Sequence, residues 1–293
     1  MPQYKRQHYL PSAYLKYFSV DQTNCTRESF IWRFDGQNQR LVPVVSQCSE
    51  DYLYSKGKAA QTEKMFQRGE DAYCQCVDKL KSGKPLTGKN YGDLIVMMFD
   101  FHLRNAAHKN LTGEEGVDAY NLRSRIFIGK ILLGREDGQI TIADIVNHIE
   151  LNWSIQIISA MPNSMFITSD HPSIWTLLNT PPVNPRPDLH LVSLPLTPKY
   201  TAVAFNRRVL QVVSSQVTSD DEKTLNIGQI ENAERCIYTS NPLVDEQMAI
   251  IKNHFDRKTS SPSEVRETAW KFPLQHLPAK YHFSFIRLNP PLM

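Results

Sequence analysis

The spacing of apolar residues predicts helices through the middle of the chain. Between residues 61 and 161 they recur every three or four positions, the period of a helix with one buried face. Gly83 and Pro85 interrupt this period and predict a turn between two helices. We expect helices over residues 62–81, 91–108, 117–133 and 142–161 and from Asp220 to about Ile237, with Thr141 and Ser219 as the N-caps of the last two.

Shorter apolar runs at both ends of this helical region predict strands. Residues 30–34 alternate, Asp35-Gly36 follows as a turn, and 40–45 can return, which together predict a β-hairpin. Further strands are expected at 165–168, 190–194 and 200–205. Because helices and strands occur in separate groups, we predict an α+β fold in which a helical bundle packs beside a mainly antiparallel sheet.

The length of 293 residues and an apolar content of 41% suit one large domain with a substantial core. We expect a single domain with four regions. These are an N-terminal hairpin region at 1–60, a helical region at 61–161, a strand and helix region at 164–240, and an extended C-terminal arm at 241–293.

Charge and cysteine content limit the functional class of the protein and the cellular compartment in which we expect it. A dedicated nucleic-acid binder usually carries a stronger basic bias than a net charge of +3, so a sequence-nonspecific nucleic-acid binder is the least favoured of three functional classes, although a local basic groove is compatible with this charge. The five cysteines form no Cys-x-x-Cys motif, so we expect reduced thiols in a cytoplasmic protein. No apolar stretch approaches the roughly 20 residues that span a bilayer, and the N-terminus lacks the pattern of a secretory signal, so we expect no membrane association.

Several short motifs occur in an order that resembles a known family. They are His8-Tyr9-Leu10-Pro11, the helix with Glu63 and Glu70, Arg104, Thr168-Ser169-Asp170-His171-Pro172, Leu194–Pro198, and Asn226. Over residues 7–240 this combination resembles a bacterial family known as domain of unknown function 4238. The sequence departs from the family pattern at His171, where asparagine is usual, and at His102, where we expect glutamine. The resemblance implies no activity.

The motif at residues 168–172 is the first candidate for chemistry. An apolar strand ends there in small polar and ionisable residues, and strand ends commonly present reactive groups. Asp170 can serve as a base, as a metal ligand, or only as an acceptor for backbone N–H groups in a turn before Pro172. His8 is a second candidate base, and the alternative is a strand or arm anchored by aromatic packing.

Glu70 and Arg104 are expected to meet between two neighbouring helices. Both lie at similar heights if helices 62–81 and 91–108 pack antiparallel, and each needs an oppositely charged partner when buried. The pair can be a structural ion pair, or Arg104 can bind a phosphate or carboxylate. We predict that His8, Glu70, Arg104 and Asp170 cluster, with secondary candidates Tyr9, Glu63, His102, Ser169, His171 and Asn226.

Besides the nucleic-acid binder, two functional hypotheses rest on these residues. The first is a hydrolase acting on a phosphodiester or nucleotide, a nuclease-like effector in the setting of a toxin or phage defence. His8 or Asp170 would be the base, Arg104 the charge stabiliser and Glu70 the orienting group. A divalent metal is compatible with these side chains, and the substrate would be anionic. The alternative is a non-catalytic sensor or anionic-ligand binding module.

Overall fold

The computed structural model describes residues 6–51, 59–103, 133, 140–176, 191–214, 217–260 and 283–288. The helices are α1 Ser12–Leu15, α2 Ala59–Lys81, α3 Gly88–Leu103, α6 Ile142–Asn152, α7 Ser219–Asn232 and α8 Asp245–Ser260, with 3-10 turns η1 Lys16–Phe18 and η2 Val44–Ser46. The strands are β1 Arg6–His8, β2 Phe30–Phe34, β3 Gln39–Pro43, β4 Ser49–Asp51, β5 Trp153–Ser159, β6 Thr168–Ser169, β7 Ile174–Thr176, β8 Leu191–Thr197, β9 Tyr200–Asn206, β10 Leu210–Val212, β11 Ile237–Thr239 and β12 Ile286–Leu288.

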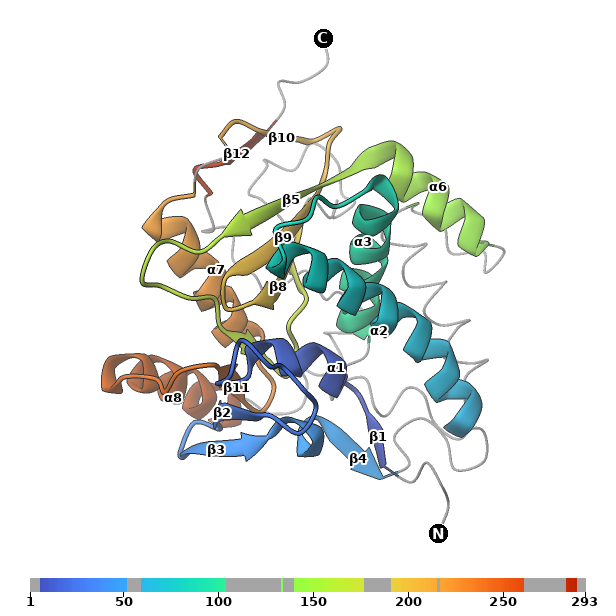
Figure 1. The fold of residues 1–293 in the computed structure, drawn as a ribbon. Helices are drawn as coiled ribbons and strands as arrows, with labels where there is room; N and C mark the ends of the chain where they lie inside the picture. The colour runs from blue at the N-terminus through green and yellow to red at the C-terminus, as the bar shows by residue number, and fades with distance from the viewer. Residues whose placement is uncertain are drawn as a thin grey trace.

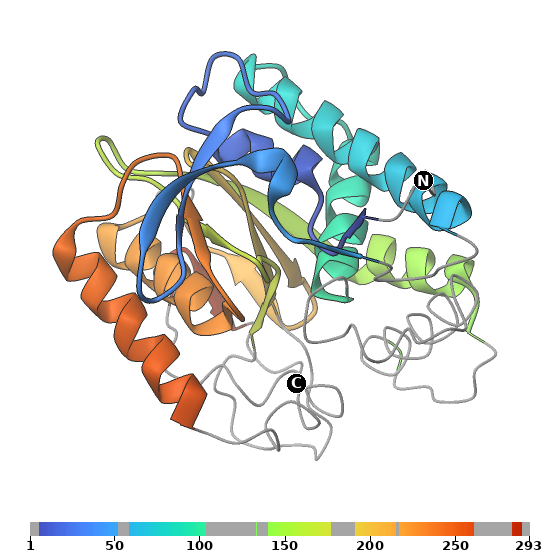
Figure 2. The same ribbon diagram turned by 90° about the horizontal axis from the view of Figure 1, so that it is seen from below.

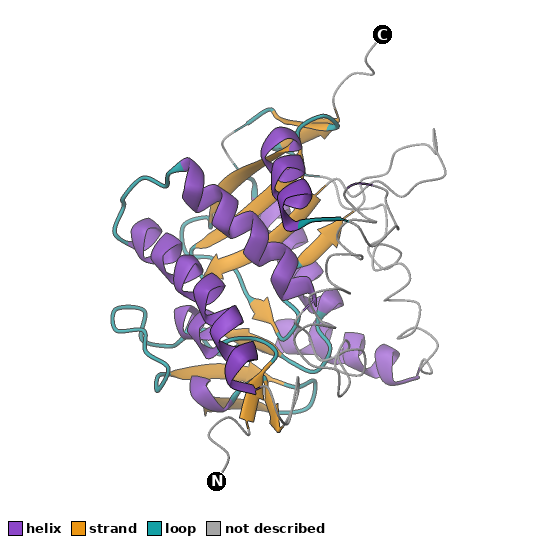
Figure 3. Cartoon of the chain, turned by 90° about the vertical axis from the view of Figure 1, so that its right-hand side faces the viewer, coloured by secondary structure: helices purple, strands orange, loops and turns teal. Residues whose placement is uncertain are grey.

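The described strands form two four-stranded antiparallel sheets and two small pairs. The upper sheet in Figure 1 has the order β5-β9-β8-β7, and the lower sheet has the order β3-β2-β11-β6. Strands β1 and β4 form one small pair, and β10 and β12 form the other. Figure 3 shows helices in front of and behind the strands. The α+β fold with mainly antiparallel sheets is therefore confirmed.

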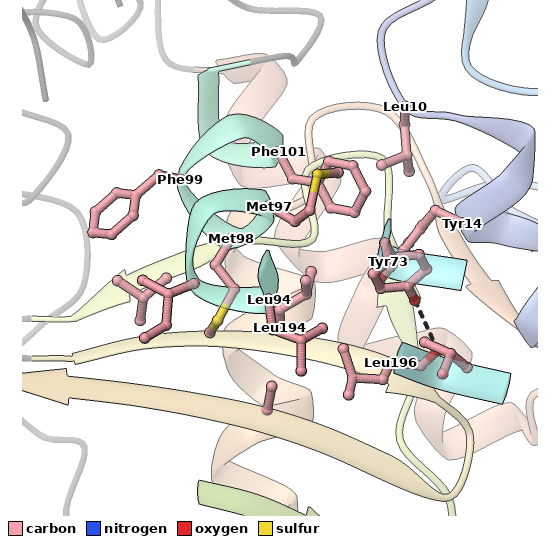
Figure 4. Packing of buried hydrophobic residues seen from close by; sticks show 14 of the residues in the cluster. Leu10, Tyr14, Tyr73, Leu94, Met97, Met98, Phe99, Phe101, Leu194 and Leu196 are labelled. Atoms are coloured by element: carbon pink, nitrogen blue, oxygen red, sulfur yellow. Dashed lines mark hydrogen bonds between the residues drawn. The ribbon is translucent and has the colours of Figure 1, made fainter. Parts of the chain in front are cut away.

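The upper sheet is covered on both faces, and this explains why every residue of β8 is buried. Val192, Leu194 and Leu196 belong to the same apolar cluster as α2 and α3. Figure 4 shows Leu94 and Met98 of α3 over this face. On the other face, Leu191 belongs to a second cluster that includes residues of α7 and the C-terminal segment 283–288. Two buried faces favour a nearly continuous apolar strand over an alternating one.

Helix α8 covers part of the lower sheet. Figure 2 shows it beside α7 and the β2–β3 hairpin. Ile251 is buried and belongs to one apolar cluster with Phe34 of β2 and Ile237 of β11. Residues 245–260 are thus helical, in the region where we expected an extended arm. Asp245 and Glu246 in the first turn favour a helix there, because acidic groups stabilise a helix N-terminus.

The helix predicted over residues 142–161 is wrong in its second half. Thr141 caps α6 as predicted, in a capping box with Asp144, but the helix ends at Asn152. The chain continues as β5, which pairs with β9 over seven residues, Trp153–Ser159. The β-branched residues of this segment suit a strand, and pairing along a neighbouring strand outweighs the local helical spacing.

The helix predicted from Asp220 to Ile237 is also shorter than expected. Its N-cap is Thr218, one residue before the predicted cap, and its capping box partner is Asp221. The helix ends at Asn232, and Ile237 lies in β11. Residues 104–108 of the predicted helix 91–108, and the predicted helix 117–133 apart from residue 133, lie outside the described residues.

The β2–β3 hairpin is confirmed, and so are the strands predicted near β8 and β9. The strand predicted at 165–168 is present only as the short β6, Thr168–Ser169. In place of a neighbouring strand, Asn226 of α7 donates to the carbonyl of Met165 and accepts from the N–H of Ile167, both at 3.0 Å. One side-chain amide therefore takes over the hydrogen bonds that a paired strand would make.

Asp221 also ties the C-terminal segment to α7, and this contact should depend on pH. Its carboxylate accepts hydrogen bonds from the backbone N–H and the hydroxyl of Ser284 as well as from Thr218. Burial alone would raise the pKa of Asp221, but these hydrogen bonds outweigh it and lower the pKa below the ordinary value. A depressed carboxylate pKa contributes stability above the unfolded pKa and loses it as the pH falls.

Asp221→Asn should therefore lower the melting temperature at pH 6, and the difference from the wild type should shrink as the pH falls below the ordinary value of 3.8. Melting curves between pH 6 and pH 2.5 measure it. Asp220→Asn, in the same first turn, is the control. A difference in melting temperature that stays constant with pH would show that the carboxylate charge of Asp221 does not contribute to stability.

Candidate functional site

The predicted motif at residues 168–172 lies at the end of β6, against the C-terminal half of α7. Ser169 is fully buried, and its hydroxyl donates to the side-chain oxygen of Gln229 at 3.1 Å. The amide of Gln229 donates to the carbonyl of Pro172 at 2.7 Å, and that of Asn232 donates to the carbonyl of His171 at 2.6 Å. The loop after the strand is therefore held by side chains of α7.

Asp170 is fully buried and binds the backbone of the segment after α7. One carboxylate oxygen accepts the N–H of Glu234 and the other accepts the N–H of Arg235, each at 2.9 Å. The backbone N–H of Asp170 donates to the carbonyl of Cys236 at 3.2 Å. Of the roles considered for Asp170, the described contacts are those of an acceptor for backbone N–H groups, although the turn that it stabilises is 64 residues away in the sequence.

The N-terminal motif reaches this site through Tyr9. Its backbone N–H donates to the carbonyl of Cys48 at 3.0 Å, and the guanidinium of Arg235 lies 5.9 Å from the centre of its ring. Burial, then the nearby Cys48 and the charge of Asp170, raise the pKa of Tyr9 far above its ordinary value. Tyr9 and Asp170 thus belong to one buried region.

Two thiols complete this region, and both stay protonated. The hydroxyl of Tyr238 lies 3.2 Å from the sulfur of Cys48, and Cys236 precedes Tyr238 by two residues. Burial, followed by the charge of Asp170, raises the pKa of Cys236 to about 12. Burial also raises the pKa of Cys48. Because the thiolate is the nucleophilic form, neither cysteine is prepared for nucleophilic catalysis at neutral pH.

The two histidines that depart from the family pattern contact each other. Nδ1 of His102 in α3 lies 3.3 Å from Nε2 of His171 and 3.4 Å from the carbonyl oxygen of Ser173. The ring of His102 stacks on Trp175, with centroids 4.0 Å apart. The two histidines are only 4% and 8% exposed.

One pair of neutral tautomers satisfies both contacts of His102 as hydrogen bonds. A carbonyl oxygen only accepts hydrogen bonds, so His102 carries a proton on Nδ1. Nε2 of His171 then accepts from the same N–H, and its own proton lies on Nδ1.

The remaining predicted residues are placed less completely. The ring of His8 contacts the carbonyl of Val45 through Nε2 at 3.3 Å. Glu70 is half-buried on α2, and Glu63 lies on the same helix, where its side chain is outside the described part. Arg104 lies outside the described residues. The predicted cluster of His8, Glu70, Arg104 and Asp170 therefore stays a prediction.

The sequence did not predict the partners that bury the site. Tyr14 donates its hydroxyl to the carbonyl of Pro195 at 2.8 Å and accepts from the hydroxyl of Thr168 at 2.7 Å. Gln229 and Asn232 were also missed. All three are ordinary helix residues in the sequence, and only the fold brings them to the strand end. No local pattern marks Gln229 and Asn232, because the buried residues of α7 are both polar and apolar.

Within the described segments, no three His, Cys, Asp or Glu side chains form a group suited to a metal ion. None of the helices described there is both long and apolar enough to cross a membrane.

These features define an α+β protein in which the N-terminal motif with Tyr9, the loop after β6 with Asp170, and strand β11 share one buried polar region. Residues 6–127 and 133–242 match the model of the family described as "Protein of unknown function (DUF4238)". The match covers most of the chain, so the protein belongs to this family, as the motif order indicated. Neither the curated proteins nor the solved structures include a match to it.

Proposed function

We propose that the protein is a non-catalytic binding module for an anionic ligand, with the strand-end motif as part of its scaffold. The observation that carries this proposal is the state of Asp170. It is fully buried, and both carboxylate oxygens accept backbone N–H groups. A general base has to come within about 3 Å of the proton that it removes, which Asp170 in this setting does not offer to a ligand.

The anionic character of the ligand is supported by Arg235. This residue is exposed, its own backbone N–H donates to Asp170, and its guanidinium lies over the ring of Tyr9. An arginine offers five N–H donors and keeps its charge, which suits phosphate or carboxylate groups. The five free thiols, three of them buried, support a cytoplasmic location for this module.

The test measures turnover and binding on the same preparation. RNA, DNA and nucleotides, with and without Mg²⁺ or Mn²⁺, should remain intact, whereas an anionic ligand among them should raise the melting temperature. Arg235→Gln should remove that shift, and Arg208→Gln, which changes another exposed arginine, should keep it. Equal shifts in both variants, or no shift with any of these ligands, would contradict the proposal.

A hydrolase acting on a phosphodiester or nucleotide is the second candidate. The pair of His102 and His171 favours it, because a donor and an acceptor imidazole side by side resemble the groups used in general acid–base catalysis. For this candidate, Asp170→Asn and His171→Asn should abolish cleavage of at least one of these substrates while the fold remains intact by circular dichroism. If the wild type cleaves none of these substrates, the hydrolase candidate is excluded.

A further inference from the structure

The imidazoles of His102 and His171 meet at a spacing that differs from a typical hydrogen bond. Nδ1 of His102 lies 3.3 Å from Nε2 of His171 and 3.4 Å from the carbonyl oxygen of Ser173. Hydrogen bonds donated by N–H groups are most often about 2.9–3.0 Å long. Nδ1 of His102 therefore faces two electron-pair donors, Nε2 of His171 and the carbonyl oxygen of Ser173, at the long end of the hydrogen-bond range.

This spacing fits a metal ion. A tetrahedral zinc site has Zn–N bonds of about 2.0–2.1 Å, so two ligand atoms on the same ion lie about 3.3–3.4 Å apart. Both distances from Nδ1 of His102 fall in this range. Imidazole is a preferred ligand of divalent zinc, cobalt, nickel and copper, and a backbone carbonyl can add an oxygen ligand.

The surrounding structure already fixes the orientation of these groups. Trp175 stacks on the ring of His102. The backbone N–H of His171 donates to Ser169, and Asn232 donates to the carbonyl groups of His171 and Ser173. Outer contacts of this kind orient ligands and increase metal affinity. A carbonyl oxygen has two lone pairs, so Ser173 can bind Asn232 and still face His102.

We propose that His102 and His171 bind a divalent first-row transition metal, such as Zn²⁺ or Co²⁺, through Nδ1 and Nε2 respectively. The carbonyl oxygen of Ser173 is the third ligand, and a water molecule completes the coordination. Metal binding at Nδ1 requires the other neutral tautomer of His102, so its ring proton moves to Nε2 with no net release. Protonation of either imidazole competes with the metal, so metal affinity falls as the pH is lowered. The inference concerns a different group from Arg235 and does not depend on the proposed function.

The test uses the full chain after treatment with a chelator. Equilibrium dialysis against Zn²⁺, followed by elemental analysis, should give one equivalent per chain, and Co²⁺ should give the visible absorption of a four-coordinate site. His102→Gln and His171→Asn should each weaken binding by about tenfold or more. His148→Asn is the control, because this histidine contacts Asn152 on α6.

Circular dichroism and melting curves of each metal-free variant show whether it is folded. Metal uptake by the wild type is a test that does not depend on whether any variant folds. A wild type that takes up no equivalent of Zn²⁺ or Co²⁺ overturns the proposal. It is also overturned if folded His102→Gln and His171→Asn proteins bind as tightly as the His148→Asn control.

Discussion

Asp170→Ala is expected to lower the free energy of unfolding by about 3–5 kcal/mol, because two charge-assisted hydrogen bonds are worth roughly 1.5–3 kcal/mol each. The substitution leaves the N–H groups of Glu234 and Arg235 without their acceptor. It also releases the turn between α7 and β11. Urea denaturation followed by circular dichroism measures the change through the transition midpoint.

Asp35→Ala is the matched control for this prediction. Asp35 also accepts two backbone N–H groups, those of Gln37 and Asn38, but it lies in the partly exposed turn of the β2–β3 hairpin. Water can replace its contacts, so its loss should cost only about 1 kcal/mol. Equal losses in the two variants would mean that the buried position of Asp170 adds nothing, and that its contacts are not central to the fold.

Tyr14→Ala is expected to cost on the order of 3–5 kcal/mol, the range found for large aromatic side chains removed from a core. Tyr14 is fully buried, and its ring contacts the rings of Phe18, Tyr73 and Phe101 at centroid distances of 5.0–5.5 Å. Its hydroxyl connects the N-terminal segment to both sheets.

Tyr14→Phe separates the ring from the hydroxyl. It should cost about 1–3 kcal/mol, since the carbonyl of Pro195 and the hydroxyl of Thr168 lose a buried partner while the packing remains. Thr168→Val, combined with Tyr14→Phe in a double-mutant cycle, measures the coupling between the two hydroxyl groups. If Tyr14→Ala cost no more than Tyr14→Phe, ring packing would contribute nothing at this position.

The sequence pattern correctly predicted the elements in which the local preference for helix or strand agrees with the contacts made in the folded protein. The alternating strand, the turn and the returning strand of the hairpin are close in sequence, and α6 begins at a capping box between Thr141 and Asp144, three positions apart. The second half of the predicted helix at 142–161 failed because its strand partner, β9, follows some forty residues later. Helical spacing carries no information about such a partner.

The candidate site shows the same limit. The motif containing Asp170 was found because polar residues end an apolar strand, but its hydrogen-bond partners are backbone N–H groups, which every sequence contains. The contact between His102 and His171 joins residues 69 positions apart. Each histidine was noticed separately as a departure from the family pattern, and only the packing of α3 beside the strand-end loop reveals them as a pair.

The lower sheet also determines when the protein can complete its fold during synthesis. Strand β2, Phe30–Phe34, pairs with β11, Ile237–Thr239, and β11 in turn pairs with β6. A ribosome must therefore add about two hundred residues after the hairpin before its central neighbour exists. Throughout that interval one flank of β2 has no strand partner, a condition that favours association with other chains. Fast translation of this stretch, or a chaperone that covers the edge of β2 until β11 is made, would protect the nascent protein.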